Sequence, residues 1–218
     1  LDLNHIAPDS RIDCAREARI FCDLSELSSN PLAGLTVGGS IGFSGYGQLS
    51  FLLLTSATPY EALQNSVRFQ ALTYLLGPLG IRPEQQFCEI TLQPLALPAW
   101  PFRQRIDMEL AGAFKLLRDL QLTAGIDLKP EQVALPYARP AESRAYEEHF
   151  GCPVVFGDTL ARIRISNSKL QQAMPTADSV TNAFYRQQCE HLREVALSDN
   201  TGNFAEQLMK GSSRIVIR

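Results

Sequence analysis

No stretch of this sequence is long and apolar enough to cross a membrane: a run of about 18 apolar residues, which a spanning helix needs, is absent. The first residues also lack the basic start and apolar block of a secretory signal peptide. Charge of one sign is not in large excess, because the formal net charge is −3. We therefore expect a cytoplasmic protein that is not, as a whole, a nucleic-acid-binding body.

Cysteine and histidine are few and are poorly spaced for chemistry. The five cysteines are an odd number without a CxxC pair, which argues against a disulfide framework and against a zinc knuckle. The three histidines, His5, His149 and His191, lack the spacing of a metal site. We expect a protein with reduced cysteines, no metal and no cofactor.

Two further absences concern catalytic motifs. The glycines crowded between residues 38 and 47 are not followed by the Lys-Ser or Lys-Thr pair of a phosphate-binding loop, nor preceded by a clear strand. They are instead predicted to let two helices, or a helix and a loop, approach closely. No GxSxG motif of a serine hydrolase is present. We predict that the protein is not an enzyme.

What the chain does contain is an alternation of helical and strand patterns. Periodicity and end signals predict helices over residues 12–27, 49–57, 58–76, 103–125, 139–150 and 176–197. Alternation predicts strands over residues 87–97, 131–136, 154–156 and 160–166. Prolines at positions 94 and 98 suggest that the first of these strands lies at a sheet edge. The predicted fold class is therefore α+β, a helix-rich single domain with a small antiparallel sheet.

Residues 146–157 place a histidine and a cysteine at an element boundary, where catalytic sites often form. Gly151 is expected to end a helix in the left-handed conformation, and Pro153 prevents the helix from continuing. His149 and Cys152 flank that helix end, so we expect their side chains to diverge. We interpret the stretch as architecture, with Tyr146 and Phe150 as core residues on one helix face.

Two alternatives assign a chemical function to this region, haem binding and catalysis. A haem bound through His149 or His191 would make the protein a gas sensor, with a Soret band on purification. A small enzyme would use His149 and Cys152 and would lose activity in His149→Ala. Burial of Cys152 beside an apolar strand argues against the second alternative, because burial raises the pKa of a thiol.

A small-molecule site is predicted where bulky apolar groups and cations lie near glycine- and proline-rich joints. Such sites combine apolar walls with a few polar anchors. The candidate ligand-binding residues are Tyr46, Trp100, Phe102, Arg103 and Arg105. The alternative for each is plain core packing, with the arginines exposed.

Three stretches together resemble one family. Residues 30–35 (NPLAGL) are similar to its DPxxGL motif, and residues 45–63 are similar to its GxxGxxLxxSxTxxEAL segment. Residues 139–157 resemble its RPxxxxxYxxxFGCPVxFG segment, which is the most specific of the three. The family is the N-terminal effector domain of AraC/XylS-type bacterial transcriptional regulators. The resemblance covers nearly all of residues 12–197.

The resemblance implies a sensor that is part of a transcription factor. In that family the N-terminal domain senses an effector or mediates dimerisation, and a C-terminal pair of helix-turn-helix motifs binds DNA. It implies a regulatory domain over residues 1–200 and a linker over residues 201–218 toward a DNA-binding domain that this sequence lacks. The implied partners are a small effector, a second copy in a homodimer, and promoter DNA through the missing domain.

A sugar ligand is not implied by the family's arabinose label. The sugar-binding cupin barrel of the arabinose regulator is mostly β, which does not match the helix-rich pattern of this chain. The mixed order of elements is more similar to the haem-nitric-oxide sensor and related small-molecule-binding folds, a likeness of fold only.

Overall fold

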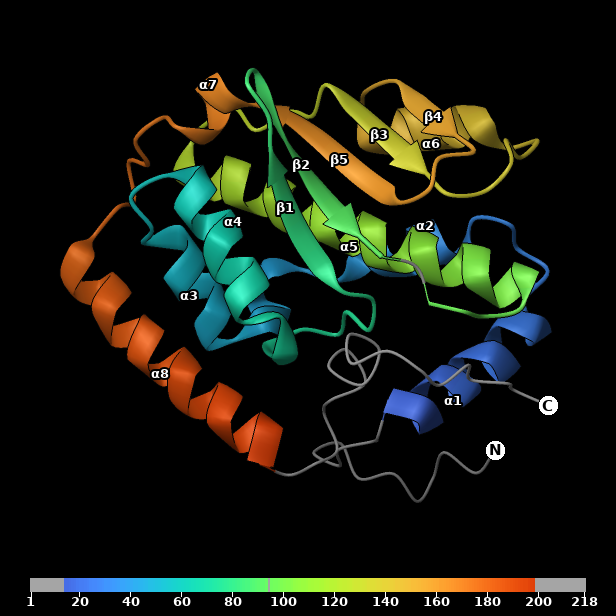
Figure 1. Ribbon diagram of the computed structural model, residues 1–218, viewed down its shortest axis with the longest axis horizontal. Coiled ribbons are helices and arrows are strands. Elements are labelled where there is room, and N and C mark those ends of the chain that lie inside the picture. Colours follow the sequence, from blue (N-terminus) through green and yellow to red (C-terminus); the bar gives the residue numbers. More distant parts are fainter. Residues whose placement is uncertain (1–13, 94, 199–218) are drawn as a thin grey trace.

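A computed structural model describes residues 14–93 and 95–198 of the chain (Figure 1). The helices are α1 (Cys14–Leu27), α2 (Ala33–Ser40), α3 (Gln48–Leu54), α4 (Pro59–Arg68), α5 (Ala99–Ala124), α6 (Ser143–Phe150), α7 (Asn167–Leu170) and α8 (Ser179–Ser198). The described residues also form the 3-10 helices η2 (Phe43–Tyr46) and η3 (Gln70–Leu72). The strands are β1 (Leu79–Pro83), β2 (Phe87–Leu92), β3 (Gln132–Leu135), β4 (Val154–Phe156) and β5 (Ala161–Ser166). The predicted linker over residues 201–218 lies outside the described residues.

The five strands form one sheet in the order β1-β2-β5-β3-β4. Every neighbouring pair is antiparallel except β3 and β4, which run parallel. Helix α6 lies between these two strands in the chain, and such a crossover is what a parallel pair requires. The α+β prediction is therefore confirmed, while the sheet is mixed instead of purely antiparallel.

Strand β2 lies inside the sheet, between β1 and β5, so the edge position predicted for it is wrong. The strand ends at Leu92, before the prolines that suggested an edge. No sequence pattern predicted β1, which pairs along its whole length with β2. Gly80 and Pro83 are poor strand residues, and they hide this strand from pattern analysis.

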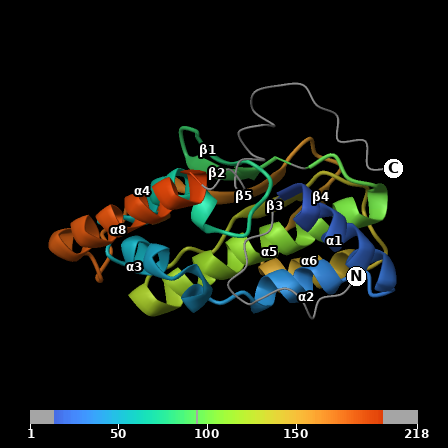
Figure 2. The same ribbon diagram turned by 90° about the horizontal axis from the view of Figure 1, so that it is seen from below.

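One face of the sheet packs on α5, which lies between the sheet and α2 (Figures 1 and 2). The alternation predicted for β5 is confirmed: Ala161, Ile163 and Ile165 are buried, whereas Arg162 and Arg164 point to the other face. Both arginines pair there with Glu89 of β2, at 3.2 and 2.8 Å. These two cations therefore neutralise a carboxylate of the sheet.

Helices α2 and α5 touch through their backbones. A Cβ atom placed on Gly34 or Gly38 would overlap the backbone oxygens of Gln104 and Met108, respectively. The side chain of Gln104 also accepts a hydrogen bond from the Gly34 N–H at 2.7 Å. The close approach predicted for the glycine-rich segment thus occurs at Gly38, and Gly34 makes a second one.

Helix ends follow the sequence signals closely. Gly125 and Gly151 end α5 and α6 in the left-handed conformation, with φ of 67° and 64°. At the start of α4 the Thr58 hydroxyl accepts the Glu61 N–H at 3.2 Å. That helix ends at Arg68, earlier than predicted, and the chain continues into η3. Tyr146 and Phe150 are both fully buried, as expected.

Replacing Gly38 with alanine is expected to lower the free energy of unfolding by about 1–3 kcal/mol, because the new Cβ forces α2 away from Met108 on α5. Chemical denaturation followed by circular dichroism measures this change. Gly42→Ala is the matched control, since nothing lies within 4 Å of its Cβ position and its φ of −76° suits alanine. Equal loss of stability in both variants would contradict the helix contact described above.

Candidate functional site

An apolar cavity of about 40 Å³ lies between α3, α4, α5 and the β1–β2 edge of the sheet. Its walls are Leu49 and Leu53 of α3, Ala62, Leu63 and Ser66 of α4, Ala113, Leu116, Leu117 and Leu120 of α5, Leu79 and Ile90 of the strands, and Tyr46, Thr73 and Leu75 of the connecting segments. Among the residues that the structure describes, no charged side chain lines this space. The cavity is therefore suited to an uncharged, apolar ligand group.

Tyr46 forms a polar end of the cavity, and Tyr74 lies beside it outside the lining. The rings of Tyr46 and Tyr74 have centroids 6.3 Å apart, and the Tyr74 hydroxyl donates to the Met108 carbonyl at 3.2 Å. Burial raises the pKa of Tyr46 to about 12 and raises that of Tyr74 still further, so both phenols are neutral. The Tyr74 hydroxyl occupies the place of a missing side chain at Gly112. Tyr46 thus offers one neutral hydrogen-bonding group to the cavity.

The five candidate ligand residues do not meet in one place. Tyr46 lines the cavity, whereas Trp100, Phe102, Arg103 and Arg105 lie on the first two turns of α5. Trp100 donates its Nε1–H to the Ser25 carbonyl at 2.9 Å, and the Arg103 guanidinium lies 5.9 Å from the Trp100 ring centroid. Phe102 packs on the edge of the core. Ligand binding by all five residues stays a prediction.

Arg103 belongs to a buried polar cluster around Asp107. It donates to the Tyr146 hydroxyl and to Glu142, each at 3.1 Å, and to the Pro31 carbonyl at 3.2 Å. The hydroxyls of Tyr137 and Tyr146 both donate to Asp107, the second at 2.7 Å. Because the Asp107 carboxyl is fully buried, its pKa is raised to about 6 despite these hydrogen bonds. The cluster joins α5 to α6 and to the loop before α2.

Arg105 forms a second buried pair on another side of α5. Its Nε donates to Glu109 at 2.6 Å, and its other nitrogens reach Glu17 of α1 at 3.0 Å and the Tyr74 carbonyl at 2.8 Å. Glu109 also accepts the Leu76 N–H at 2.9 Å, and burial raises the pKa of this carboxyl. An anion bound by Arg105 would leave a buried carboxylate unpaired, which is costly. Arg105 is thus committed to holding α1 and residues 74–76 on α5.

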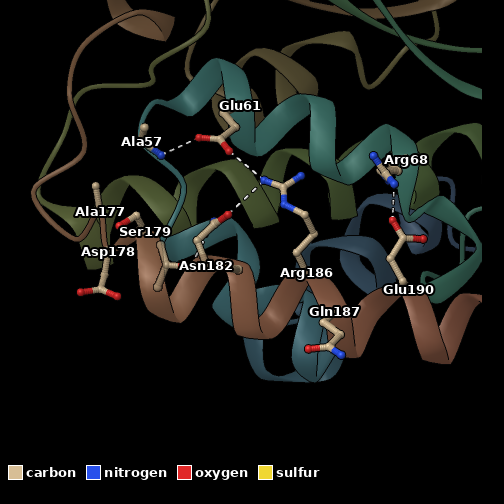
Figure 3. A pocket seen from close by; sticks show the side chains of 12 residues that line it. Ala57, Glu61, Arg68, Ala177, Asp178, Ser179, Asn182, Arg186, Gln187 and Glu190 are labelled. Carbon is tan, nitrogen blue, oxygen red and sulfur yellow. Dashed lines mark hydrogen bonds and ion pairs between the residues drawn. The ribbon is translucent and has the colours of Figure 1, made fainter.

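A larger, polar groove of about 640 Å³ runs between α4 and α8 (Figure 3). At its centre Arg186 of α8 donates to Glu61 at 2.8 Å, to Asn65 at 2.9 Å and to Asn182 at 3.0 Å. Arg68 and Glu190 pair farther along the groove. This groove was not predicted from the sequence, because its residues come from segments about 120 positions apart along the chain.

His149 and Cys152, the residues of the two chemical alternatives, occupy structural positions. The His149 ring packs against Phe114 and Phe150, with centroids 5.8 and 4.9 Å away, and its Nε2 is buried without a hydrogen-bond partner. Burial lowers the pKa of His149 and raises that of the Cys152 thiol. Cys152 is therefore a neutral thiol, and neither group has the shift that would activate a nucleophile.

The described residues offer neither a metal site nor a membrane-spanning helix. Within residues 14–93 and 95–198, no three or more His, Cys, Asp or Glu side chains are grouped so that they could hold a metal ion. No helix in the same part of the chain is both long enough and apolar enough to span a membrane.

Comparison with known proteins gives consistent results. Residues 1–174 match the family model described as the arabinose-binding domain of AraC transcription regulator, N-terminal. The chain is 23% identical to the ornithine utilization regulator of Pseudomonas aeruginosa over 187 residues, which are 85% of this chain and 54% of that protein. It resembles the crystal structure of transcriptional regulator CdpR from Pseudomonas aeruginosa with a TM-score of 0.67 and 21% identity, over 81% of this chain and 55% of that one.

These matches have two direct consequences. The chain spans about half the length of both relatives, 54% of one and 55% of the other. The family and both relatives are transcription regulators and not enzymes, which sets aside the alternative of a small enzyme using His149 and Cys152.

Asp107 is expected to make stability depend on pH. Its folded-state pKa of about 6 lies above the ordinary value of 3.8. Its contribution to the free energy of unfolding is therefore fully present below pH about 4 and is lost as the pH rises through about 6. Denaturation of wild type and Asp107→Asn between pH about 4 and 7 should show the wild-type advantage falling by roughly 3 kcal/mol.

The control for this experiment is Glu131→Gln, which changes an exposed carboxylate. It should keep the pH dependence of the wild type. A difference between wild type and Asp107→Asn that stays constant over this range would show that Asp107 is ionised throughout.

Proposed function

Because the chain belongs to the family of AraC-type N-terminal domains, we propose that it senses a small effector, which binds in the cavity between α3, α4 and α5. The observation that carries the proposal is the cavity itself, a space between α3, α4, α5 and the sheet with largely apolar walls and the neutral phenol of Tyr46. Small-molecule sites in proteins have this composition. The domain belongs to a transcription regulator, so effector binding would control transcription.

The cavity favours an uncharged effector with an apolar body and one hydrogen-bonding group directed at Tyr46. A sugar carries hydroxyls on every side, and an ornithine-like amino acid carries several charges. Transfer of such groups into apolar surroundings costs a few kcal/mol for each group left without a partner. We therefore do not extend to this chain the arabinose of the family's description or the ornithine of its relative's name.

Of the five candidate residues, Tyr46 is proposed as the direct ligand contact. Arg103 and Arg105 are proposed as positioning residues, because their hydrogen bonds hold the segments around α5 in place. Trp100 and Phe102 are proposed to support the same part of α5. Among the described residues that line the cavity, none is a histidine or a cysteine, so this proposal does not include a haem.

DNA binding is proposed to belong to a part of the protein outside this chain, since the relatives are about twice as long. The proposed location is the cytoplasm, where the promoter DNA of a bacterial regulator lies. A homodimer is also proposed. Its support is a set of exposed apolar side chains on α8 and the adjacent α3, namely Val180, Phe184 and Phe51. The rings of Phe51 and Phe184 both contact Tyr185.

Cyclohexanol tests the cavity, because it combines an apolar ring with one hydroxyl. It is expected to raise the Tm of the wild type and to shift NMR signals of cavity methyl groups, whereas cyclohexylammonium, which has the same shape and a charge, is not. Ala113→Leu fills the cavity from the α5 wall and is expected to weaken cyclohexanol binding at least about tenfold.

Ala141→Leu is the matched control, since Ala141 is exposed and lies outside the cavity. Wild-type affinity in Ala113→Leu would place the bound cyclohexanol elsewhere. Stronger stabilisation by cyclohexylammonium, arabinose or ornithine than by cyclohexanol would contradict the proposed class of effector.

Sedimentation equilibrium tests the homodimer. Phe184→Glu places a charge in the exposed apolar set and is expected to shift the dimer toward monomer by tenfold or more in dissociation constant. Leu122→Glu, at an exposed leucine of α5, is the control and should leave association unchanged. A wild type that stays monomeric at about 100 μM would count against self-association through this set.

A further inference from the structure

One face of helix α4 lines the cavity, and another face contacts α8. Ala62, Leu63 and Ser66 line the apolar cavity. Glu61 and Asn65, which alternate with them along the helix, accept hydrogen bonds from Arg186 of α8. The contact between Glu61 and Arg186 is drawn in Figure 3. A helix is rigid over this length, so a shift of one face moves the other.

Helix α3 is divided in the same way. Leu49 and Leu53 face the cavity. The carbonyls of Leu52 and Leu54 accept hydrogen bonds from Asn182, at 3.1 Å, and from Thr176 just before α8, at 2.6 Å. The cavity and α8 therefore share two helices, α3 and α4, as their common wall.

Beside apolar contacts such as that of Phe51 with Tyr185, a polar network holds α8 on this wall. Arg186 connects Glu61, Asn65 and Asn182, and the buried Asn65 in turn donates to Ser56 at 3.2 Å. Hydrogen bonds weaken steeply when distance or angle changes, more steeply than apolar contacts do. The groove beside Arg186 adds to this sensitivity, because it leaves open space where side chains could otherwise pack.

The opposite wall of the cavity is fixed. Helix α5 is held by backbone contact with Gly34 and Gly38 of α2, and it packs on the sheet on its other side. The cavity measures only about 40 Å³, while ligand pockets are commonly several hundred Å³. A ligand larger than a few atoms therefore needs more room, and α3 and α4 are the wall that can yield.

We propose that effector binding in the cavity displaces α3 and α4 and thereby releases α8 from its polar hold at Arg186. The proposal rests on the effector cavity proposed above and adds the output of that site. Binding and release are thermodynamically linked, so a protein whose α8 is already released must bind the effector more tightly. A typical coupling corresponds to a change in affinity of about 5-fold or more.

Hydrogen exchange and cyclohexanol affinity test the proposal in the same protein. Saturating cyclohexanol is expected to speed amide exchange along α8 by about 5-fold or more, with little change in β2 and β5 of the sheet. Arg186→Met removes the three hydrogen bonds while keeping an unbranched, flexible stem. It is expected to show fast α8 exchange without ligand and an affinity raised by about 5-fold.

Two further variants complete the design. Glu61→Gln is milder, because the amide keeps an acceptor for the Ala57 N–H while the ion pair with Arg186 is lost. Its affinity should rise by a smaller factor than that of Arg186→Met. Arg144→Met makes the same substitution at an arginine that is 90% exposed on α6, and it should behave as the wild type.

The outcomes separate the two proposals. No cyclohexanol binding in the cavity would overturn the proposed function. Binding with unchanged or slower exchange in α8, or equal affinities in wild type, Arg186→Met and Glu61→Gln, would overturn the release of α8 and leave the cavity proposal standing.

Discussion

Backbone contact between α2 and α5 is the constraint on which the rest of the domain depends. Only glycine at positions 34 and 38 lets the two helices come this close. The contact fixes α5, and α5 then holds other segments through side chains that are unusual for a helix interior: Arg103, Arg105, Asp107 and Glu109. Each of these groups has partners on another segment, so the polar positions of α5 determine where α1, α6 and residues 74–76 lie.

The sequence predicts most of the elements whose ends carry a strong local signal. The helix end at Gly151, the short strand after Pro153 and the buried pair Tyr146 and Phe150 follow from steric rules that act within a few residues. Strand β1 was not predicted, because Gly80 and Pro83 have poor strand propensity. Its pairing with β2 outweighs that propensity in the fold. The interior position of β2 was not predicted for a related reason. It depends on which strands pair with β2, and strand β5 is distant from it in the sequence.

The candidate site was harder to predict from the sequence than the fold. Tyr46 was identified as a bulky group near glycines. The other cavity residues are mostly leucines and alanines, whose roles appear only when α3, α4 and α5 come together. Arg103 and Arg105 are only two positions apart in the sequence. On a helix, however, side chains two positions apart point in different directions. One arginine therefore joins the Asp107 cluster and the other joins Glu109.

The contact between Tyr74 and Gly112 offers a handle for protein engineering. The Tyr74 hydroxyl lies in the volume that any side chain at position 112 would fill. A single methyl group there would push the phenol away from Met108 and from its neighbour Tyr46, and thus remodel the polar end of the cavity. A substitution at position 112 could therefore change ligand preference while every residue that lines the cavity keeps its identity.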